Sequence, residues 1–328
     1  MRQREDIDTI LDSDSIDPEL ARELELSIEI REFASSHLLL PDNGSYKQYV
    51  ETGREAVTWN VVAAPEFSLK PRQWCFIVSG CVSYRGYFKS KDAERLAGKL
   101  RASGFDTAVS PVIAYSTLGW FDDPLLDTMF RYSDEQLAAF IFHELAHQQL
   151  YVKGDTAFNE AYASFVEETG VRLWLEYSGK ADRLPGWLKL ERAGIELNEL
   201  LQDTQKKLGV LYSSDLPEDR MREEKSALYD GLHEAYRALV ESRWDDHGYY
   251  DSTFSRPMNN ARLALLSSYR GGACAFSQLY QSAQGDMARF QRLAREKSSL
   301  DSNQRGAWLQ QTCITSEIRP VTLSRNQE

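Results

Sequence analysis

The sequence predicts a helix-rich α+β protein in which a small α/β lobe is followed by a helical lobe with a long helical hairpin. Segments rich in β-branched and aromatic residues, bounded by proline and glycine, occur before residue 120. Apolar residues at helical spacing dominate from residue 133 onward. A chain of 328 residues is also too long for most single compact cores. We therefore expect an N-terminal lobe at 1–130, a helical lobe at 131–320 and a loose tail at 321–328.

The N-terminal lobe is expected to begin with a helix at 18–38. Asp17 can cap this helix, and Pro18 fits its first position because proline lacks the N–H that would be unsatisfied there. Strand, helix and strand then form a small α/β lobe. Its expected elements are strands at 58–64 and 74–80, a helix at 91–103 and a strand at 107–117.

The helical lobe is expected to start at Ser133, which can form a capping box with Gln136. Apolar residues then recur at threes, fours and fives, which indicates a helix that Gly154 closes. The other expected elements are a helix at 157–177 and the two arms of a helical hairpin, at 187–211 and 219–243.

The net charge of the chain indicates which classes of partner it can bind. The chain carries 38 Lys and Arg against 50 Asp and Glu, a net charge of −12. Phosphate backbones would be repelled, so no nucleic-acid partner is expected. No stretch approaches the roughly 18–20 apolar residues of a membrane span, and no apolar signal core follows Met1. These features predict a chain without a transmembrane segment, either cytoplasmic or mature after removal of a leader.

The four cysteines leave the redox state open. Cys75 and Cys81 lie six apart, and Cys274 and Cys313 fall in the last quarter of the chain. An even number allows two disulfides in three pairings, and buried reduced thiols are an equal alternative. A thiolate metal site is not expected because there is no Cys-x-x-Cys.

Two of the five histidines fall in a His-Glu-x-x-His pattern, residues 143–147. His143 and His147 are four apart, so both leave the same helical face and can bind one zinc ion at about 2.0–2.1 Å. Glu144 is then turned toward the water at that ion. Such a pattern arises by chance in well under about one in a hundred chains of this composition. The alternative is a pair of satisfied core histidines.

A catalytic zinc usually takes three protein ligands and leaves a fourth position open. The link at 153–156 is short enough to fold the next helix back against the first. This places Glu160 nearest His147 and predicts Glu160 as the third ligand, with Glu167 as the next candidate. Glu167 could instead be a solvated residue or a hydrogen-bond partner of a ligand histidine.

Zinc with an adjacent glutamate is typical of amide hydrolysis. The ion lowers the pKa of bound water toward about 7. Glu144 can take the remaining proton as general base and pass it to a leaving amine. The motif does not identify the donor that stabilises the oxyanion.

Several blocks beyond this motif resemble a bacterial family of predicted zinc aminopeptidases, within the gluzincin type of His-Glu-x-x-His plus Glu. Together they span about residues 45–280. Residues 158–163, Phe-Asn-Glu-Ala-Tyr-Ala, are similar to the block that carries the third zinc ligand in other gluzincins, although only twelve residues separate His147 from Glu160. The blocks are 59–66, 74–88, 114–124, 143–168, and 259–263 with Tyr269.

The resemblance implies a gluzincin-like helical lobe, one Zn²⁺ ion and removal of N-terminal residues from a peptide substrate. An aminopeptidase also needs an acid for the free ammonium, an oxyanion donor and contacts to the peptide. The acid candidates are Glu66, Asp122, Asp123 and Glu167. The oxyanion candidates are Tyr269, Arg262 and Tyr115, with His247 as an alternative. The assigned substrate-binding candidates are Tyr115, Glu66 and Asn260, and Arg85 could bind a substrate carboxylate.

Members of the resembling family often carry an export leader. If one has been removed here, the resemblance implies the bacterial cell envelope or periplasm, with Cys75–Cys81 or Cys274–Cys313 as disulfides; otherwise the protein is cytoplasmic. Other functions stay open. One is a zinc endopeptidase or cell-wall amidase, and another is a non-catalytic metal-bearing scaffold whose hairpin at 187–243 docks a partner protein.

Overall fold

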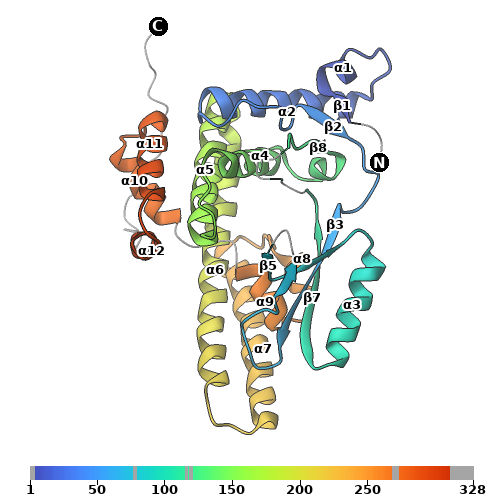
Figure 1. The fold of residues 1–328 in the computed structure, drawn as a ribbon, viewed down its shortest axis with the longest axis vertical. Coiled ribbons are helices and arrows are strands. Elements are labelled where there is room, and N and C mark those ends of the chain that lie inside the picture. Colours follow the sequence, from blue (N-terminus) through green and yellow to red (C-terminus); the bar gives the residue numbers. More distant parts are fainter. Residues whose placement is uncertain (1–3, 77–79, 115–116, 118–120, 268–272, 311–328) are drawn as a thin grey trace. The chain divides into compact units, whose positions relative to one another are not determined.

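The computed structural model describes residues 4–76, 80–114, 117, 121–267 and 273–310. The chain forms two compact units, and each is discontinuous in sequence (Figure 1). Unit 1 comprises 1–54, 114–187 and 270–328, and unit 2 comprises 55–113 and 188–269. The predicted boundary near residue 130 falls inside unit 1, so it does not coincide with a boundary between the units. The predicted tail at 321–328 lies outside the described residues.

Unit 1 is mostly helical with one small sheet. In this sheet β2 pairs antiparallel with β1 and parallel with β8. The elements are β1 (Glu5–Asp6), α1 (Ile7–Leu11), α2 (Pro18–Ser36), β2 (Gln48–Val50), β8 (Leu125–Leu126), η1 (Asp127–Arg131), α4 (Asp134–Gln149), α5 (Thr156–Tyr177), η2 (Ala181–Arg183), the first turn of α6 (Leu184–Tyr212), α10 (Ala273–Ser282), α11 (Met287–Ser298) and α12 (Ser302–Leu309).

The helix starts of unit 1 follow the predicted capping residues. The Asp17 side chain accepts from the first turn of α2, with Pro18 at the first position. The Ser133–Gln136 capping box opens α4. The predicted end of α4 at Gly154 is wrong: the helix ends at Gln149, because Leu150 takes an extended backbone with φ −147°. Gly154, at φ +81°, instead turns the link to α5.

Helix α5 is mostly buried because other helices pack on two of its sides. One side packs on α4 and the other on the C-terminal helices. The ring of Phe158 lies 5.3 Å from that of Phe276, and Phe165 lies 4.8 Å from Phe290. These contacts fix α5 inside unit 1.

Gly170 marks the closest approach of α5 to its neighbours. A Cβ at this position would lie 2.8 Å from atoms of both Leu38 and Phe142, and both side chains are fully buried. Gly170→Ala is therefore expected to lower the free energy of unfolding by about 1–3 kcal/mol, because the core has no room to shift. Gly306 in α12 has no atom within 4 Å of such a Cβ, so Gly306→Ala should be neutral or stabilising. Denaturant unfolding of both variants checks this, and an unchanged midpoint for Gly170→Ala would contradict it.

Unit 2 combines a three-stranded antiparallel sheet with long helices. The strand order is β6-β3-β7, with Val61 opposite Val109 in the register of β3 and β7. One face packs on α3 and the other on α9. The elements are β3 (Thr58–Pro65), β4 (Trp74–Phe76), β5 (Gly80–Val82), β6 (Arg85–Tyr87), α3 (Ser90–Ala102), β7 (Phe105–Val112), the remainder of α6, α7 (Glu218–Arg243), α8 (Asp251–Phe254) and α9 (Asn260–Ser267).

The predicted strand at 74–80 is a pair of short strands. β4 and β5 pair antiparallel with Cys75 opposite Cys81, and a disulfide joins these two cysteines. Residues 77–79 lie outside the described part. Cys274 is also disulfide-bonded, and its partner falls outside the described residues. The predicted strand at 107–117 corresponds to β7 and ends earlier, at Val112.

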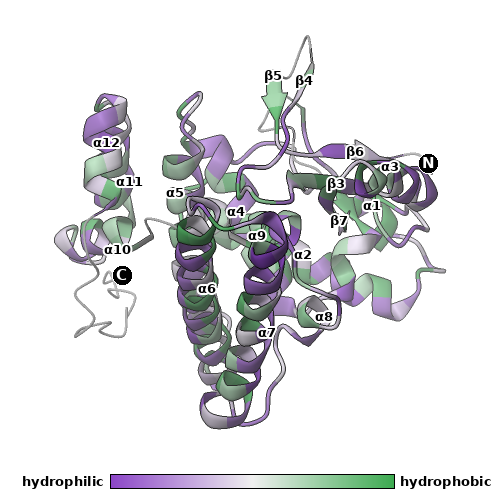
Figure 2. Cartoon of the chain, turned by 90° about the horizontal axis from the view of Figure 1, so that it is seen from below, coloured by the Kyte–Doolittle hydropathy of each residue, from purple (hydrophilic) through white to green (hydrophobic). Residues whose placement is uncertain are grey.

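Helices α6 and α7 form the predicted hairpin and lie side by side in Figures 1 and 2. Apolar residues of α7 pack against those of α6 in one core cluster, with Leu232 and Tyr236 at 2% and 3% exposure. The helix-rich α+β fold with a helical hairpin is thus confirmed. In the described residues, no helix combines the length and apolar character that crossing a membrane requires.

Candidate metal centre

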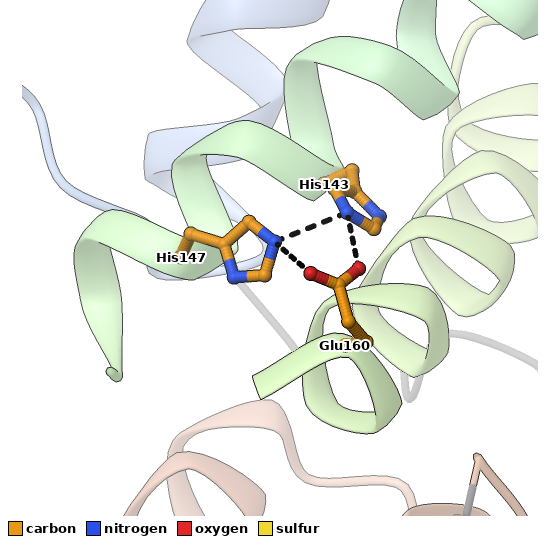
Figure 3. A group of neighbouring side chains, drawn as sticks. All are labelled: His143, His147 and Glu160. Carbon is orange, nitrogen blue, oxygen red and sulfur yellow. Dashed lines mark hydrogen bonds and ion pairs between the residues drawn. The ribbon is translucent and has the colours of Figure 1, made fainter. Parts of the chain in front are cut away.

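Helices α4 and α5 of unit 1 bring three predicted ligands together. His143 and His147 leave α4 on one face, and Glu160 projects from the first turns of α5 (Figure 3). The two Nε2 atoms are 3.1 Å apart. The carboxylate of Glu160 bridges them, with Oε2 3.5 Å from His143 Nε2 and Oε1 3.6 Å from His147 Nε2. Two imidazoles and one carboxylate therefore face a common point.

The spacing of these atoms fits a metal ion. Donors at about 2.0–2.1 Å from a tetrahedral ion are separated from one another by about 3.3–3.4 Å. The three separations of 3.1, 3.5 and 3.6 Å bracket that value. His143, His147 and Glu160 could therefore hold a metal ion.

Glu167 occupies the outer side of His143. Its Oε2 lies 2.9 Å from His143 Nδ1. This hydrogen bond orients the ring so that Nε2 faces Glu160 and His147. Of the alternatives that the sequence left open for Glu167, the geometry favours the hydrogen-bond partner of a ligand histidine.

The electrostatics of the site favour a positive charge. Burial lowers the pKa of His143, but hydrogen bonds to Glu160 and Glu167 and the charge of Glu144 outweigh it, so the pKa is raised. Burial and the charge of His143 lower the pKa of His147. The pKa of Glu160 is lowered, since its contacts with the two histidines outweigh burial.

Glu144, the predicted base, is half-buried on α4 between the two histidines in sequence. Its negative charge acts on His143 and on Tyr46. Burial, then Glu144 and Asp123, raise the pKa of Tyr46, which is 2% exposed. Tyr46 is a neighbour of the base that sequence reasoning missed, because it lies almost 100 residues earlier in no motif.

A loop around Tyr46 holds the end of α4 next to the second histidine. Asn43 Nδ2 donates to Gln148 Oε1 at 2.7 Å, and Gln148 Nε2 donates to Ser45 Oγ at 3.3 Å. The buried guanidinium of Arg31 donates to the backbone of the same loop, at Pro41 and Ser45. Gln148 directly follows His147, so this loop restrains the position of that ligand.

At the opposite end of α4, Arg183 holds the first turn. Its guanidinium lies 2.8 Å from Asp134 Oδ2 and 2.6 Å from Glu135 Oε1. Two carboxylates at a helix N-terminus also complement the helix dipole. Helix α4 is therefore anchored at both ends.

The remaining acid candidates in unit 1 have different surroundings. Asp123 is 2% exposed, and its Oδ2 accepts from Thr117 N at 2.9 Å, so it is used to hold its own loop. Asp122 lies beside Gly44, where a Cβ would come within 2.5 Å of its carboxyl carbon.

Several other candidates belong to unit 2. Glu66 forms an ion pair with Arg222, with Oε1 2.7 Å from Nε. Asn260 is fully buried, and its Oδ1 accepts from the hydroxyls of Tyr212 and Tyr229, both at 2.7 Å. Its Nδ2 donates to the Glu66 carbonyl at 2.9 Å. The position of Glu66 is thus tied to the end of the hairpin at which α6 and α7 are joined.

The last candidates divide between unit 2 and the residues that are not described. Arg262 donates to the Thr253 carbonyl at 3.4 Å, and burial lowers the pKa of its guanidinium. His247 Nδ1 lies 3.0 Å from the Trp244 carbonyl. The guanidinium of Arg85 lies 5.5 Å from the centroid of the Tyr87 ring. Tyr115 and Tyr269 lie outside the described residues. The assigned roles of all these residues stay predictions.

Comparison with known proteins agrees with the site. No curated protein and no solved structure gives a significant match to the chain. The sequence model of one protein family, described as "Putative aminopeptidase", matches residues 1–309. This match includes α4, α5 and all three ligand candidates. The chain therefore belongs to the putative aminopeptidase family.

Proposed function

We propose that the protein is a zinc-dependent aminopeptidase that removes N-terminal residues from peptides. The observation that carries this proposal is the convergence of His143, His147 and Glu160 beside Glu144. Membership of an aminopeptidase family supports peptides as the substrate class. Two nitrogen donors and one carboxylate favour Zn²⁺ over Mg²⁺ or Ca²⁺, which prefer oxygen ligands alone.

Each residue of the site has a separate role in the proposed hydrolysis. His143, His147 and Glu160 would hold one zinc ion and leave a position open for water or substrate. When bound, zinc supplies Lewis acidity at the scissile carbonyl. Glu144 accepts a proton from the attacking water and passes it to the leaving amine. Glu167 keeps the ring of His143 in the orientation that directs Nε2 inward.

Substrate contacts are part of the same proposal. Tyr269 and Arg262 are proposed as donors to the oxyanion, because a phenol or a guanidinium can donate hydrogen bonds to it. Tyr115 and Glu66 are proposed to contact the peptide. Asn260 is proposed to support the substrate contact of Glu66, because its Nδ2 donates to the backbone carbonyl of Glu66.

We also propose the bacterial cell envelope as the location. The Cys75–Cys81 disulfide and the oxidised Cys274 support it, since disulfides persist in oxidising compartments and are rare in the cytosol. Trapping of free thiols in intact cells tests this. Cysteines that react fully with the trapping reagent would contradict it.

Metal removal tests the proposed activity. Dialysis against a chelator is expected to abolish hydrolysis of aminoacyl substrates and to lower the melting temperature, because bound metal stabilises the folded protein. Zinc added back in equimolar amount should restore both. Hydrolysis that persists in protein shown by elemental analysis to be metal-free would contradict the proposal.

A further inference from the structure

We propose that Arg305, in the C-terminal helix α12, is a positioning residue for the metal ligand Glu160. The inference rests on the proposed function of the metal centre. It arises from an ion pair that connects α12 to the residue capping α5, the helix that carries Glu160. Sequence spacing gives no indication of it, because 145 positions separate the two residues.

Arg305 is a buried arginine with a fixed geometry. It is 9% exposed, and its Nε lies 2.7 Å from Asp155 Oδ2. Its Nη1 donates to the carbonyls of Ser298, at 3.3 Å, and Leu300. The guanidinium is thereby held by the turn between α11 and α12 on one side and by Asp155 on the other.

Asp155 connects Arg305 to the start of α5. Its Oδ1 accepts from the backbone N–H of Phe158 at 3.1 Å, and its carbonyl accepts from the N–H of Asn159 at 3.1 Å. One carboxylate thus caps the helix with one oxygen and binds Arg305 with the other. Capping residues of this kind fix the first turn, whose N–H groups lack partners within the helix.

Asn159, directly before Glu160, also restrains the start of α5. Its side chain is 2% exposed and bonds both backbone groups of Val152, which lies in the link from α4. Val152 N donates to Oδ1 at 2.8 Å, and Nδ2 donates to Val152 O at 2.9 Å. The first turn of α5 is therefore tied to the end of α4 and, through Asp155, to α12.

Aromatic packing places α12 against the same turn. The ring of Trp308 lies 6.2 Å from that of Phe158 and 4.8 Å from that of Phe276. Glu160 follows Asp155 by five positions, about 7.5 Å along a helix axis. The carboxylate of Glu160 lies within 3.6 Å of both Nε2 atoms, so fraying or rotation at the start of α5 would move it away from them.

The test compares metal binding in the wild-type protein and four variants. Arg305→Gln removes the charge, Arg305→Lys keeps it with different geometry, and Asp155→Asn keeps a capping oxygen while losing the ion pair. Ile7→Ala is the control: it empties a buried position in α1, which packs on β1 and α2. The measurements are zinc affinity by chelator competition, the visible spectrum of the Co²⁺-substituted protein, and melting temperature.

Arg305→Gln and Asp155→Asn are expected to raise the zinc dissociation constant about tenfold or more and to change the Co²⁺ spectrum. Arg305→Lys should recover part of the affinity. Ile7→Ala should lower the melting temperature and leave affinity and spectrum unchanged.

Two results overturn the inference while leaving the proposed function intact. One is affinity within twofold of wild type in both Arg305→Gln and Asp155→Asn. The other is an equal loss in Ile7→Ala, which would assign Arg305 to general stability. A wild-type protein that neither binds zinc nor hydrolyses peptides overturns the proposed function and this inference with it.

Discussion

His147→Ala is expected to raise the zinc dissociation constant about a hundredfold or more and to abolish hydrolysis. Zinc bound by four protein ligands gains about 10–16 kcal/mol, or about 3 kcal/mol per ligand. Because each 1.4 kcal/mol is about tenfold in affinity, one lost ligand costs about two powers of ten. His147 is 5% exposed, so its truncation leaves a buried position with no donor side chain. Chelator competition followed by elemental analysis measures the effect.

The matched control is His247→Ala. His247 lies in unit 2, and its Nδ1 is 3.0 Å from the Trp244 carbonyl. This variant should keep one equivalent of zinc at wild-type affinity. Zinc held at wild-type affinity by His147→Ala would show that the ion binds elsewhere, and it would refute the assignment of the ligands.

Glu144→Gln is expected to lower kcat by about 10²–10⁴-fold while leaving the zinc content unchanged. Glutamine has nearly the same shape as glutamate but cannot accept a proton at neutral pH. Glu144 is separate from the three groups that face the ion, so metal binding should survive. Steady-state kinetics on an aminoacyl substrate, paired with metal analysis of the same sample, gives both quantities.

Glu25→Gln, at an exposed position of α2, controls for the loss of one negative charge. Its kcat and zinc content should equal those of wild type. If Glu144→Gln retains kcat within a few-fold, the general base is another group.

Local signals predicted many helices and strands well. Asp17 with Pro18 and Ser133 with Gln136 gave the starts of α2 and α4, because a cap needs only residues within three or four positions. The end of α4 was missed because Gly154 is a strong stop signal, whereas the helix stops where Leu150 becomes extended. An extended leucine has no distinctive sequence signal.

The division into two units could not be predicted from local patterns. Each unit combines segments that are far apart in sequence, and periodicity reports only which face of an element is buried, not which element covers it. For example, α9 packs on the sheet formed by β3 and β7, more than 140 residues earlier. Pairing of this kind depends on tertiary packing.

Within the candidate site, the predictable part was the set fixed by one helix and one short link. The i, i+4 spacing placed His143 and His147 on one face, and the link brought Glu160 to them. Of the residues that restrain these ligands, only Glu167 was among the sequence candidates. Gln148 and Arg305 act through contacts with residues far away in the sequence, and such contacts leave no periodic trace in it.

The most direct test of the central claim is mass spectrometry of a mixed peptide library after incubation with the zinc-loaded protein, with Glu144→Gln in parallel. The account predicts ladders of peptides shortened one residue at a time from the N-terminus by wild type and intact peptides with the variant. Internal cuts would identify an endopeptidase instead. No cleavage by the zinc-loaded wild type would contradict the proposed peptidase activity.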